Sequence, residues 1–350
     1  MKVHIIGGGI VGMSTAYHLV QAGCSVTVFE KDKQYAESSF ARSCGGFRAQ
    51  YFTETNVKMS RYSIDFVKNN TNVEFTPNGY LMLFGTDQKN DCDASTILQR
   101  SLGATTTALT PADINQQFDY LSTDDLYRGC ITTDGSEGWL DPTTLHQWYK
   151  QNTDCDIVYE DGTKVNHDEA DAVVIAAGCW SYKVGKTFGL EIPVRPHKHT
   201  VFNVSTAKPV IKDMPLVADL VTGVYLRPEG EGYIVGYDGN GTYNDEDLEP
   251  DWNSWNEVWE YLYHRFPTVF DEAKMTGAWA GYYDASTIDN NAVIDSRDKY
   301  YFATGFTGRG LMHSPAVGLT LSEMICKKNL TFNISAYKLN RKPDVEKYVI

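Results

Sequence analysis

The first thirty residues constrain the fold more than any other part of the chain. Gly7, Gly9 and Gly12 stand at G-x-G-x-x-G spacing, directly after the short apolar run 3–6. At this spacing the first glycine permits a tight turn, the second lets the backbone approach a pyrophosphate, and the third allows close packing of helix against strand. We therefore expect a buried parallel strand over 3–6, a helix over 13–21, and a dinucleotide whose phosphates lie at the N-terminus of that helix.

Glu30 strengthens this expectation. It ends a second apolar run, 26–29, and stands about twenty residues after the glycines, where an acidic side chain accepts a hydrogen bond from a ribose hydroxyl. A glycine-rich turn without a ligand is the alternative, but it does not explain the strand, the helix and the acid together. Up to this point NAD and FAD fit equally well, whereas an acidic residue at this position disfavours NADP.

Composition and charge exclude several classes of protein. The net charge of −14 argues against a nucleic-acid partner, because its phosphates would be repelled. No apolar run approaches the roughly eighteen residues that a membrane-spanning helix needs. The seven cysteines are odd in number and none has C-x-x-C spacing, so we expect neither a disulfide framework nor a metal site. A cytoplasmic protein is favoured, with peripheral contact to a membrane left open.

Helical patterns recur between extended segments. Helix caps are expected at Thr110 and at Asp141, each followed by a proline in the first turn. Trp252, Trp255 and Trp259 share one face of a further helix, and core packing is the favoured explanation of that face. The expected helices cover 56–67, 91–102, 143–151 and 251–266, together with one that opens at Thr110 and one from His313 to about residue 327.

Extended segments fall into two groups. The continuous apolar run 172–177 predicts a strand buried on both faces, in the same parallel sheet as 3–6. Short strands with turn signals over 193–237 indicate an antiparallel sheet, and Asp161-Gly162 indicates a hairpin turn within 158–165. A last strand over 300–303 precedes the glycine-rich segment 304–310.

Seven motifs follow one another along the chain in an order that resembles a known family. They are 7–31, R-x-x-G-G-x-R at 42–48 followed by Asn56-Val57, G-x-x-D-P at 138–142, V-x-A-A-G-x-W within 173–180, and the segments 223–228, 279–281 and 305–318. In this order they resemble the D-amino-acid-oxidase-type family of FAD oxidoreductases. The likeness is greatest to its amine-oxidising branch, which includes sarcosine oxidase β-type, L-proline dehydrogenase β-type and dimethylglycine dehydrogenase-like proteins.

The resemblance implies an α/β fold, in which a Rossmann-like FAD-binding domain is interleaved with an α+β substrate domain built on an antiparallel sheet. The FAD-binding domain would comprise 1–75, 140–190 and 290–350, and the substrate domain 76–139 and 191–289. The AMP end of FAD would lie on the first glycines, and the flavin would lie at the domain boundary. There the N-terminus of the last helix would stabilise the negative charge of the reduced ring.

The residues that the resemblance implies for FAD come from both ends of the chain and from two segments between them. They are Gly7, Gly9, Ile10, Val11, Gly12, Glu30, Lys31, Arg42, Ser43, Gly45, Gly46, Ala177, Gly178, Trp180, Gly305, Gly308, Arg309, Gly310, Leu311 and Met312.

Four residues are implied to contact the substrate. Arg48 is the first candidate, because a planar guanidinium suits a carboxylate; a surface arginine or one that supports FAD is the alternative. Arg309 takes the place of the histidine in the family's G-H-G motif and is the second candidate, with charge balance to the FAD pyrophosphate as the alternative. Tyr225 and Tyr282 would wall a small-amine pocket, although core packing explains them equally well.

Three departures from the family pattern refine this picture. The segment 141–178 is shorter than is usual, so no residue is assigned to the adenine. No cysteine or histidine follows Trp279-Ala280-Gly281 at the flavin-linking position, which predicts non-covalent FAD. The strand 233–236 has no lysine, whereas oxygen-reacting oxidases place one there, so we expect a dehydrogenase whose electron acceptor is not identified.

The implied reaction transfers a hydride from the carbon next to nitrogen of a small amine or amino acid to flavin N5. Sarcosine, proline, glycine and N-methyl amino acids are the substrate types considered. An FAD-dependent 2-hydroxy acid or glycerol-phosphate dehydrogenase is one alternative, and a catalytically silent flavoprotein subunit or assembly factor is another. Homo-oligomerisation and membership of a larger complex stay open.

Overall fold

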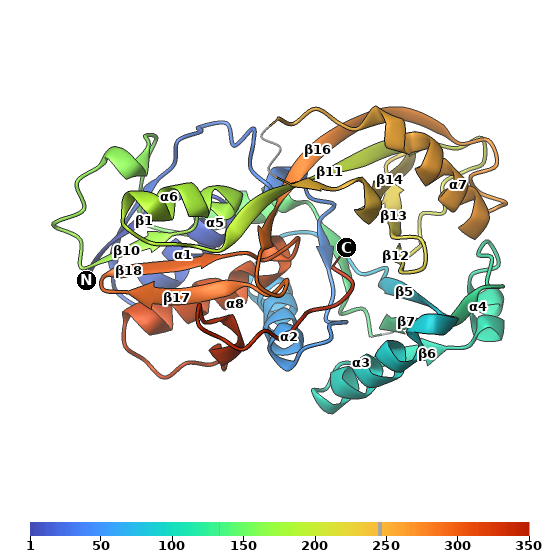
Figure 1. Cartoon of the computed structure of the whole chain (residues 1–350), viewed down its shortest axis with the longest axis horizontal. Coiled ribbons are helices and arrows are strands. Elements are labelled where there is room, and N and C mark those ends of the chain that lie inside the picture. Colours follow the sequence, from blue (N-terminus) through green and yellow to red (C-terminus); the bar gives the residue numbers. More distant parts are fainter. Residues whose placement is uncertain (133, 244–246, 350) are drawn as a thin grey trace.

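The computed structural model describes residues 1–132, 134–243 and 247–349. Two large sheets occupy opposite ends of the molecule, and the N-terminus and C-terminus lie at the left edge and near the middle of Figure 1. A short three-stranded sheet is formed by β3 (Gly46–Phe47), β8 (Gly138–Leu140) and β4 (Phe75–Thr76). The fold is α/β, as the sequence predicts.

The six-stranded sheet has the order β17-β18-β10-β1-β2-β9. Neighbouring strands are parallel except at the edge, where β17 runs antiparallel to β18. The expected strands over 3–6 and 172–177 are therefore confirmed in one parallel sheet, where they are neighbours. The second strand ends at Ile175, and every residue from Ala172 to Ile175 is buried. The strands of the six-stranded sheet are β1 (Lys2–Ile6), β2 (Ser25–Phe29), β9 (Asp156–Val158), β10 (Ala172–Ile175), β17 (Val293–Arg297) and β18 (Tyr300–Thr304).

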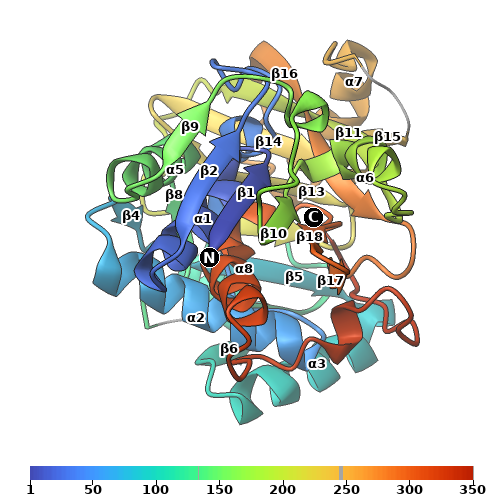
Figure 2. The same cartoon turned by 90° about the vertical axis from the view of Figure 1, so that its left-hand side faces the viewer.

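Helices cover both faces of this sheet. Val3, Ile5 and Val174 point into a core shared with α1 and α8, whereas Ile6 and Ile175 point toward α6. In Figure 2, α8 and α2 lie on one side of these strands and α6 lies on the other. The helices of this end are α1 (Ile10–Gln21), α2 (Glu54–Asn70), α5 (Pro142–Gln151), α6 (Ser181–Thr187) and α8 (Gly310–Ile325).

The nine-stranded sheet has the order β15-β11-β14-β13-β12-β5-β7-β6, with β16 paired to β11. It is antiparallel as expected, except that β12 and β5 are parallel. Its strands are β5 (Tyr80–Gly85), β6 (Thr106–Leu109), β7 (Leu126–Thr132), β11 (Val194–Ser205), β12 (Leu216–Asp219), β13 (Val224–Glu229), β14 (Gly232–Tyr237), β15 (Thr242–Tyr243) and β16 (Lys274–Ser286). The helices α3 (Lys89–Ser101), α4 (Pro111–Gln117) and α7 (Trp255–Arg265) belong to this end.

The strands of the two large sheets interleave along the chain in the order that the expected domains require. The domain boundaries themselves stay a prediction.

Helices α1 and α8 cross at very short distance, because a glycine lies at the crossing. A Cβ atom on Gly318 would lie 2.4 Å from Ser14 Oγ, so a larger residue would force the helices apart. The Ser14 hydroxyl also donates a hydrogen bond of 2.7 Å to the Ser314 carbonyl. This crossing fixes the relative position of two helices that are almost three hundred residues apart in the sequence.

The last long helix begins earlier than the sequence predicts. It starts at Gly310 instead of His313, so that Pro315 lies inside the helix. Proline cannot donate the hydrogen bond that would reach the Leu311 carbonyl. The hydroxyl of Ser314 donates to that carbonyl instead, at 2.8 Å, which satisfies the acceptor and lets the helix pass through the proline.

Two further expectations are wrong. Asp161-Gly162 does not form a hairpin, because the Asp161 carboxylate accepts from Thr163 N at 3.0 Å and caps the 3-10 helix Gly162–Lys164. The tryptophan face is not wholly in the core. Trp252 lies in a separate 3-10 turn before α7 and is 49% exposed, because the Asp251 side chain caps that turn at Asn253 N.

Candidate active site

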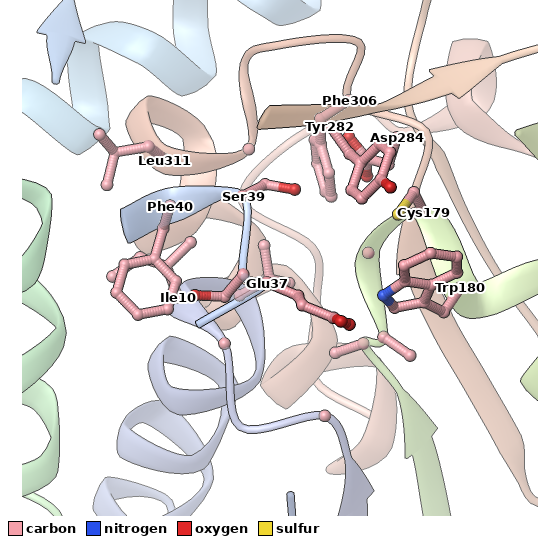
Figure 3. Close-up of a pocket in the computed structure, with 18 of the residues that line it drawn as sticks. Ile10, Glu37, Ser39, Phe40, Cys179, Trp180, Tyr282, Asp284, Phe306 and Leu311 are labelled. Atoms are coloured by element: carbon pink, nitrogen blue, oxygen red, sulfur yellow. The ribbon is translucent and has the colours of Figure 1, made fainter. Parts of the chain in front are cut away.

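A cavity of about 620 Å³ lies between the two large sheets. The N-terminus of α1 reaches it through Gly9, Ile10 and Val11, and the N-terminus of α8 reaches it through Gly310, Leu311 and Met312. Figure 3 shows Ile10 and Leu311 at this cavity, with Phe306, Tyr282, Asp284, Cys179 and Trp180 around it. Two helix N-termini thus direct their unpaired N–H groups at one cavity, which favours a ligand with negative charge at two places.

The three glycines of the fingerprint have different physical roles. Gly7 has φ +105°, and a Cβ there would lie 2.5 Å from the Ala176 carbonyl oxygen. A Cβ on Gly12 would lie 1.9 Å from the Gly7 carbonyl oxygen. A Cβ on Gly9 would meet no atom within 4 Å, although Gly9 lines the cavity. Gly7 and Gly12 are therefore required by packing, whereas Gly9 leaves room for a ligand.

Glu30 lines the cavity beside these glycines. One carboxylate oxygen accepts from Gly8 N at 2.7 Å, and the other accepts from Asp32 N at 2.9 Å. These bonds fix the carboxylate at the end of β2. An ionised carboxylate has about four acceptor sites, so both oxygens keep capacity for the hydroxyls of a ribose.

The middle of the cavity combines small and cationic residues. Gly46, Ala177 and Gly178 line it, and Lys31 and Lys183 place their Nζ atoms 5.2 Å and 5.3 Å from the ring centroid of Trp180. Ser43 and Arg42 also line it, and the Arg42 guanidinium donates to the carbonyls of Ala36 and Ala280 at 2.9 Å and 2.8 Å. The small residues give room and the cations give positive charge, a combination that suits a phosphate-containing ligand.

Four tyrosines form the wall at the side of the nine-stranded sheet: Tyr80, Tyr225, Tyr282 and Tyr283. The ring of Tyr225 lies against Gly236, where a Cβ would be 2.0 Å from Tyr225 Cζ. The Tyr282 hydroxyl donates to the Asp247 carbonyl at 2.8 Å. Burial raises the pKa of the phenols of Tyr80, Tyr225 and Tyr283, so these hydroxyls stay protonated at neutral pH.

Arg48 does not line this cavity but lies behind its tyrosine wall. Its guanidinium carbon is 5.5 Å from the ring centroid of Tyr80 and 4.4 Å from that of Tyr51, and the residue is 2% exposed. Its Nη1 donates to the Gln50 carbonyl and lies 3.4 Å from the sulfur of Met82. Its Nε has no hydrogen-bond partner among the described residues.

Arg309 is also buried outside the cavity lining, 2% exposed, directly before α8. Its Nη2 donates to the Asn290 carbonyl, and its guanidinium carbon is 5.8 Å from the ring centroid of Tyr51. Its Nε and Nη1 have no hydrogen-bond partner within the described part of the chain. Two guanidiniums with unused donors thus lie close to one tyrosine, behind the cavity wall.

Asp284 holds the loop that precedes α8. It lines the cavity, and its Oδ2 accepts from Gly305 N at 2.8 Å and from Thr304 Oγ1 at 3.3 Å. Burial raises the pKa of this carboxyl to about 6, although the backbone hydrogen bonds oppose the shift. Asp284 therefore connects the cavity wall to the glycine-rich loop before α8.

Comparison with known proteins identifies the ligand class. A family model described as FAD dependent oxidoreductase (DAO) matches residues 2–324. The chain belongs to this family of FAD-dependent oxidoreductases. The cofactor of the family is FAD, and the cavity fits it: glycine leaves the approach to α1 open, and a second helix N-terminus lies at the far end.

Similar proteins support the same assignment. The chain is 30% identical to FAD-dependent oxidoreductase domain-containing protein 1 of Xenopus laevis, over 97% of this chain and 82% of that protein. It is 25% identical to mitochondrial dimethylglycine dehydrogenase of Homo sapiens, over 96% of this chain but 44% of that protein. The structure of L-proline dehydrogenase from P. horikoshii superposes with a TM-score of 0.86 at 26% identity, covering 96% of both chains.

The cavity includes most of the residues expected to bind FAD or substrate, which stay predictions as ligand contacts. Gly12, Gly45, Gly305, Arg48 and Arg309 are the expected residues outside its lining. Gly45 has a packing role instead, because its Cβ would lie 2.1 Å from the Leu140 carbonyl oxygen. The motif spacing could not separate these glycines from ones that face a ligand.

Sequence reasoning missed several lining residues. Asp161, Gly162 and Thr163 line the end near Glu30, in the shortened segment to which no adenine contact was assigned. Tyr80, Tyr283 and Asp284 line the other end. Tyr283 follows an expected residue directly, and that adjacency was the one signal available for it.

Proposed function

We propose that the chain is a dehydrogenase that oxidises a small amine or amino acid. The observation that carries the proposal is the continuity of the cavity from the glycines at α1, past the N-terminus of α8, to a pocket walled by Tyr80, Tyr225, Tyr282 and Tyr283. Bound FAD would accept the hydride from the substrate carbon. The tyrosine wall would give the pocket its shape around a small substrate and exclude water from it.

The ionisation of the wall limits what its residues can do. The phenols of Tyr225 and Tyr283 stay neutral because burial raises their pKa, so they donate hydrogen bonds but do not act as bases. His199 also lines the cavity, and burial lowers its pKa to about 3. At this pKa His199 stays neutral at neutral pH. Its Nε2 is 3.0 Å from Nδ1 of His197, so the two rings share a hydrogen bond. We therefore assign removal of the amine proton to none of these three side chains.

The two buried arginines supply positive charge behind the wall. Arg48 is proposed as the partner of a substrate carboxylate, because it lies directly behind Tyr80 with an unused Nε donor. Arg309 is proposed as a second source of positive charge, through its unused Nε and Nη1. The names of L-proline dehydrogenase and dimethylglycine dehydrogenase support an amino-acid substrate.

The dehydrogenase assignment rests on β14. Gly236 of this strand lies under the Tyr225 ring, and Ile234 is on the same face by the two-residue alternation of a strand. This strand contains no lysine, whereas the oxygen-reacting oxidases are expected to carry one there. We propose that electrons leave to an acceptor other than oxygen and that FAD is bound without a covalent link.

Anaerobic titration of the oxidised holoprotein tests the proposal. L-proline, sarcosine, glycine, N-methyl amino acids and D-amino acids are added separately, and bleaching of the visible flavin band reports oxidation of the substrate. Bleaching by at least one amine is expected. Bleaching by lactate or glycerol 3-phosphate alone would identify a hydroxy-acid or glycerol-phosphate dehydrogenase, and no bleaching by any compound would indicate a silent flavoprotein.

Two further measurements test the proposed electron acceptor and the non-covalent binding of FAD. Oxygen consumption is compared with reduction of an artificial acceptor, and equal rates would contradict the dehydrogenase assignment. Acid precipitation should leave the flavin in the supernatant. Flavin retained in the pellet would show a covalent link, for which Cys44, Cys179 and His199 in the cavity lining are the residues to examine.

A further inference from the structure

Glu137 is a fully buried carboxylate that lies outside the cavity lining and has no role in the proposed chemistry. It directly precedes β8, and its backbone is held firmly. Its carbonyl accepts from Gly79 N at 3.1 Å, and the following Gly138 packs so closely that a Cβ would lie 1.9 Å from the Thr76 carbonyl oxygen. The side chain therefore projects from a rigid base.

Both oxygens of this carboxylate hold the loop that carries Arg48. Oε1 accepts from Ala49 N at 2.6 Å, and Oε2 accepts from Gln50 Nε2 at 2.7 Å. Ala49 is the residue after Arg48, and the Gln50 carbonyl accepts from Arg48 Nη1. The carboxylate thus fixes the backbone and the acceptor that together orient the guanidinium.

The same network reaches the cavity wall. Gln50 Nε2 also donates to the Tyr80 carbonyl at 2.7 Å, and Tyr80 lines the cavity in front of Arg48. Without the carboxylate, the Gln50 amide would keep one of its two acceptors and the Ala49 N–H would be buried without one. Buried donors without an acceptor are unfavourable, so the loop would rearrange.

We propose that Glu137 is a positioning residue that holds Arg48 and Tyr80 in the arrangement that binds the substrate carboxylate. This inference rests on the proposed function, because it assigns the purpose of the arrangement to a carboxylate. Glu137 acts through Ala49 and Gln50 and touches neither cofactor nor substrate.

If Glu137 acted only through its negative charge, its removal would have the opposite effect on binding of a substrate carboxylate. This difference makes the inference testable. Glu137, Glu346, Tyr51 and Tyr80 act electrostatically on Arg48. Arg48 also acts electrostatically on Tyr283 and His313. If Glu137 were only a counter-ion, its removal would leave more positive charge for a substrate carboxylate and would strengthen binding. If it positions the loop, its removal weakens binding.

The test uses 2-furoate, a carboxylate that cannot be oxidised, as a probe of the holoprotein. Its dissociation constant is measured from the perturbation of the flavin absorption band. Glu137→Gln keeps the shape but opposes its amide N–H to that of Gln50, and Glu137→Asp keeps the charge but is one methylene too short. Each should raise the dissociation constant about tenfold, the equivalent of one charge-assisted hydrogen bond.

Glu323→Gln is the matched control. Glu323 is also buried, and it accepts from Thr331 N and Thr331 Oγ1 at 2.8 Å and 2.6 Å near the far end of α8, away from the cavity. This variant should lose stability without a change in 2-furoate binding. Tighter binding in Glu137→Gln with unchanged binding in Glu137→Asp would overturn the inference in favour of a counter-ion role.

The pH dependence gives a second readout. Burial raises the pKa of Glu137 to about 7 in spite of its hydrogen bonds and the positive charge of Arg48. Below about this pH the carboxyl carries a proton that opposes one of its two donors, so 2-furoate binding should weaken as the pH falls toward about 6. Asp284, which also lines the cavity, has a pKa of about 6 and is present in both proteins. The additional weakening that Glu137 causes near pH 7 should be missing in Glu137→Gln, and an identical profile in both proteins would contradict the inference.

Hydrogen exchange separates this inference from the proposed function. In the holoprotein, the amides of residues 48–53 should exchange faster in both Glu137 variants than in the wild type and in Glu323→Gln. If 2-furoate does not bind the wild type, the carboxylate part of the proposed function fails, and unchanged exchange in the variants would independently overturn the positioning role.

Discussion

The two ends of the cavity are built in opposite ways. At the α1 end, Gly7, Gly9 and Gly12 lie within six residues of one another, and Gly7 and Gly12 pack closely against main-chain atoms of Ala176 and Gly7. At the tyrosine end, Tyr80, Tyr225 and Tyr283 come from β5, β13 and β16, and Arg48 stands behind them on a separate loop. The first end is a local motif, whereas the second exists only when distant strands are paired.

This difference predicts that the α1 end tolerates fewer substitutions than the tyrosine end. A Cβ added at Gly7 or Gly12 would meet main-chain atoms, which cannot move aside. A wall of side chains from several strands can adjust, and a single substitution changes affinity more than folding. The predictions below test this contrast, from the largest expected effect to the smallest.

Gly12→Val should eliminate FAD from the purified protein. Its Cβ would lie 1.9 Å from the Gly7 carbonyl oxygen, so β1 and α1 could not keep their positions. The ratio of flavin to protein absorbance measures the loss. Gly9→Ala is the comparison, since its Cβ meets no protein atom, and it should fold normally while binding FAD more weakly. Equal FAD content in both variants would break the proposed contrast.

Asp284→Asn probes the glycine-rich loop before α8, which lies between the two ends of the cavity. The folded-state pKa of Asp284 is raised from 3.8 to about 6, so the folded protein binds more protons than the unfolded chain between these pH values. Stability of the wild type should therefore fall relative to the variant as the pH rises through this window, by roughly 3 kcal/mol. Urea unfolding of both proteins at several pH values measures the difference. A difference in stability that does not change with pH would show that the pKa of Asp284 is not raised in the folded protein.

Arg48→Ala should raise KM for an amino-acid substrate roughly 100-fold while FAD stays bound, because the positive charge behind the tyrosine wall is lost. Steady-state kinetics and the flavin absorbance ratio give the two readouts. Arg48→Lys should recover only part of the affinity, since lysine lacks the planar fork. Loss of FAD in Arg48→Ala would assign this arginine to cofactor support instead.

Tyr225→Phe should have the smallest effect, a fall in kcat/KM of roughly fivefold, which corresponds to one neutral hydrogen bond. The ring would still fill the space over Gly236, and only the hydroxyl that faces Tyr283 is removed. Gly236→Ala is the sharper comparison, because its Cβ would lie 2.0 Å from Tyr225 Cζ and would displace the whole ring. If the two variants behave alike, the position of the ring does not matter for the substrate.

The fold could be predicted from the sequence where the signal is local. The parallel strands β1, β2 and β10, the antiparallel character of the second sheet and the helix caps at Thr110 and Asp141 were all expected and are present. Each of these features depends on hydrophobic pattern or capping within a few residues. Errors arose where two local signals compete, as at Asp161-Gly162, whose carboxylate caps a 3-10 helix, and at Pro315, whose missing hydrogen bond is replaced by Ser314.

The sequence by itself determined the glycine-rich turn, the acidic residue after it and the motif order that indicates FAD. Only the tertiary structure decided that Arg48 lies behind Tyr80 and that Gly45 packs against β8. It also decided that Glu137 accepts hydrogen bonds from Ala49 and Gln50, the two residues after Arg48. The physical reason is the range of the interactions. A turn is defined by backbone angles over a few residues, whereas the surroundings of a buried charge depend on which distant strands are brought together around it.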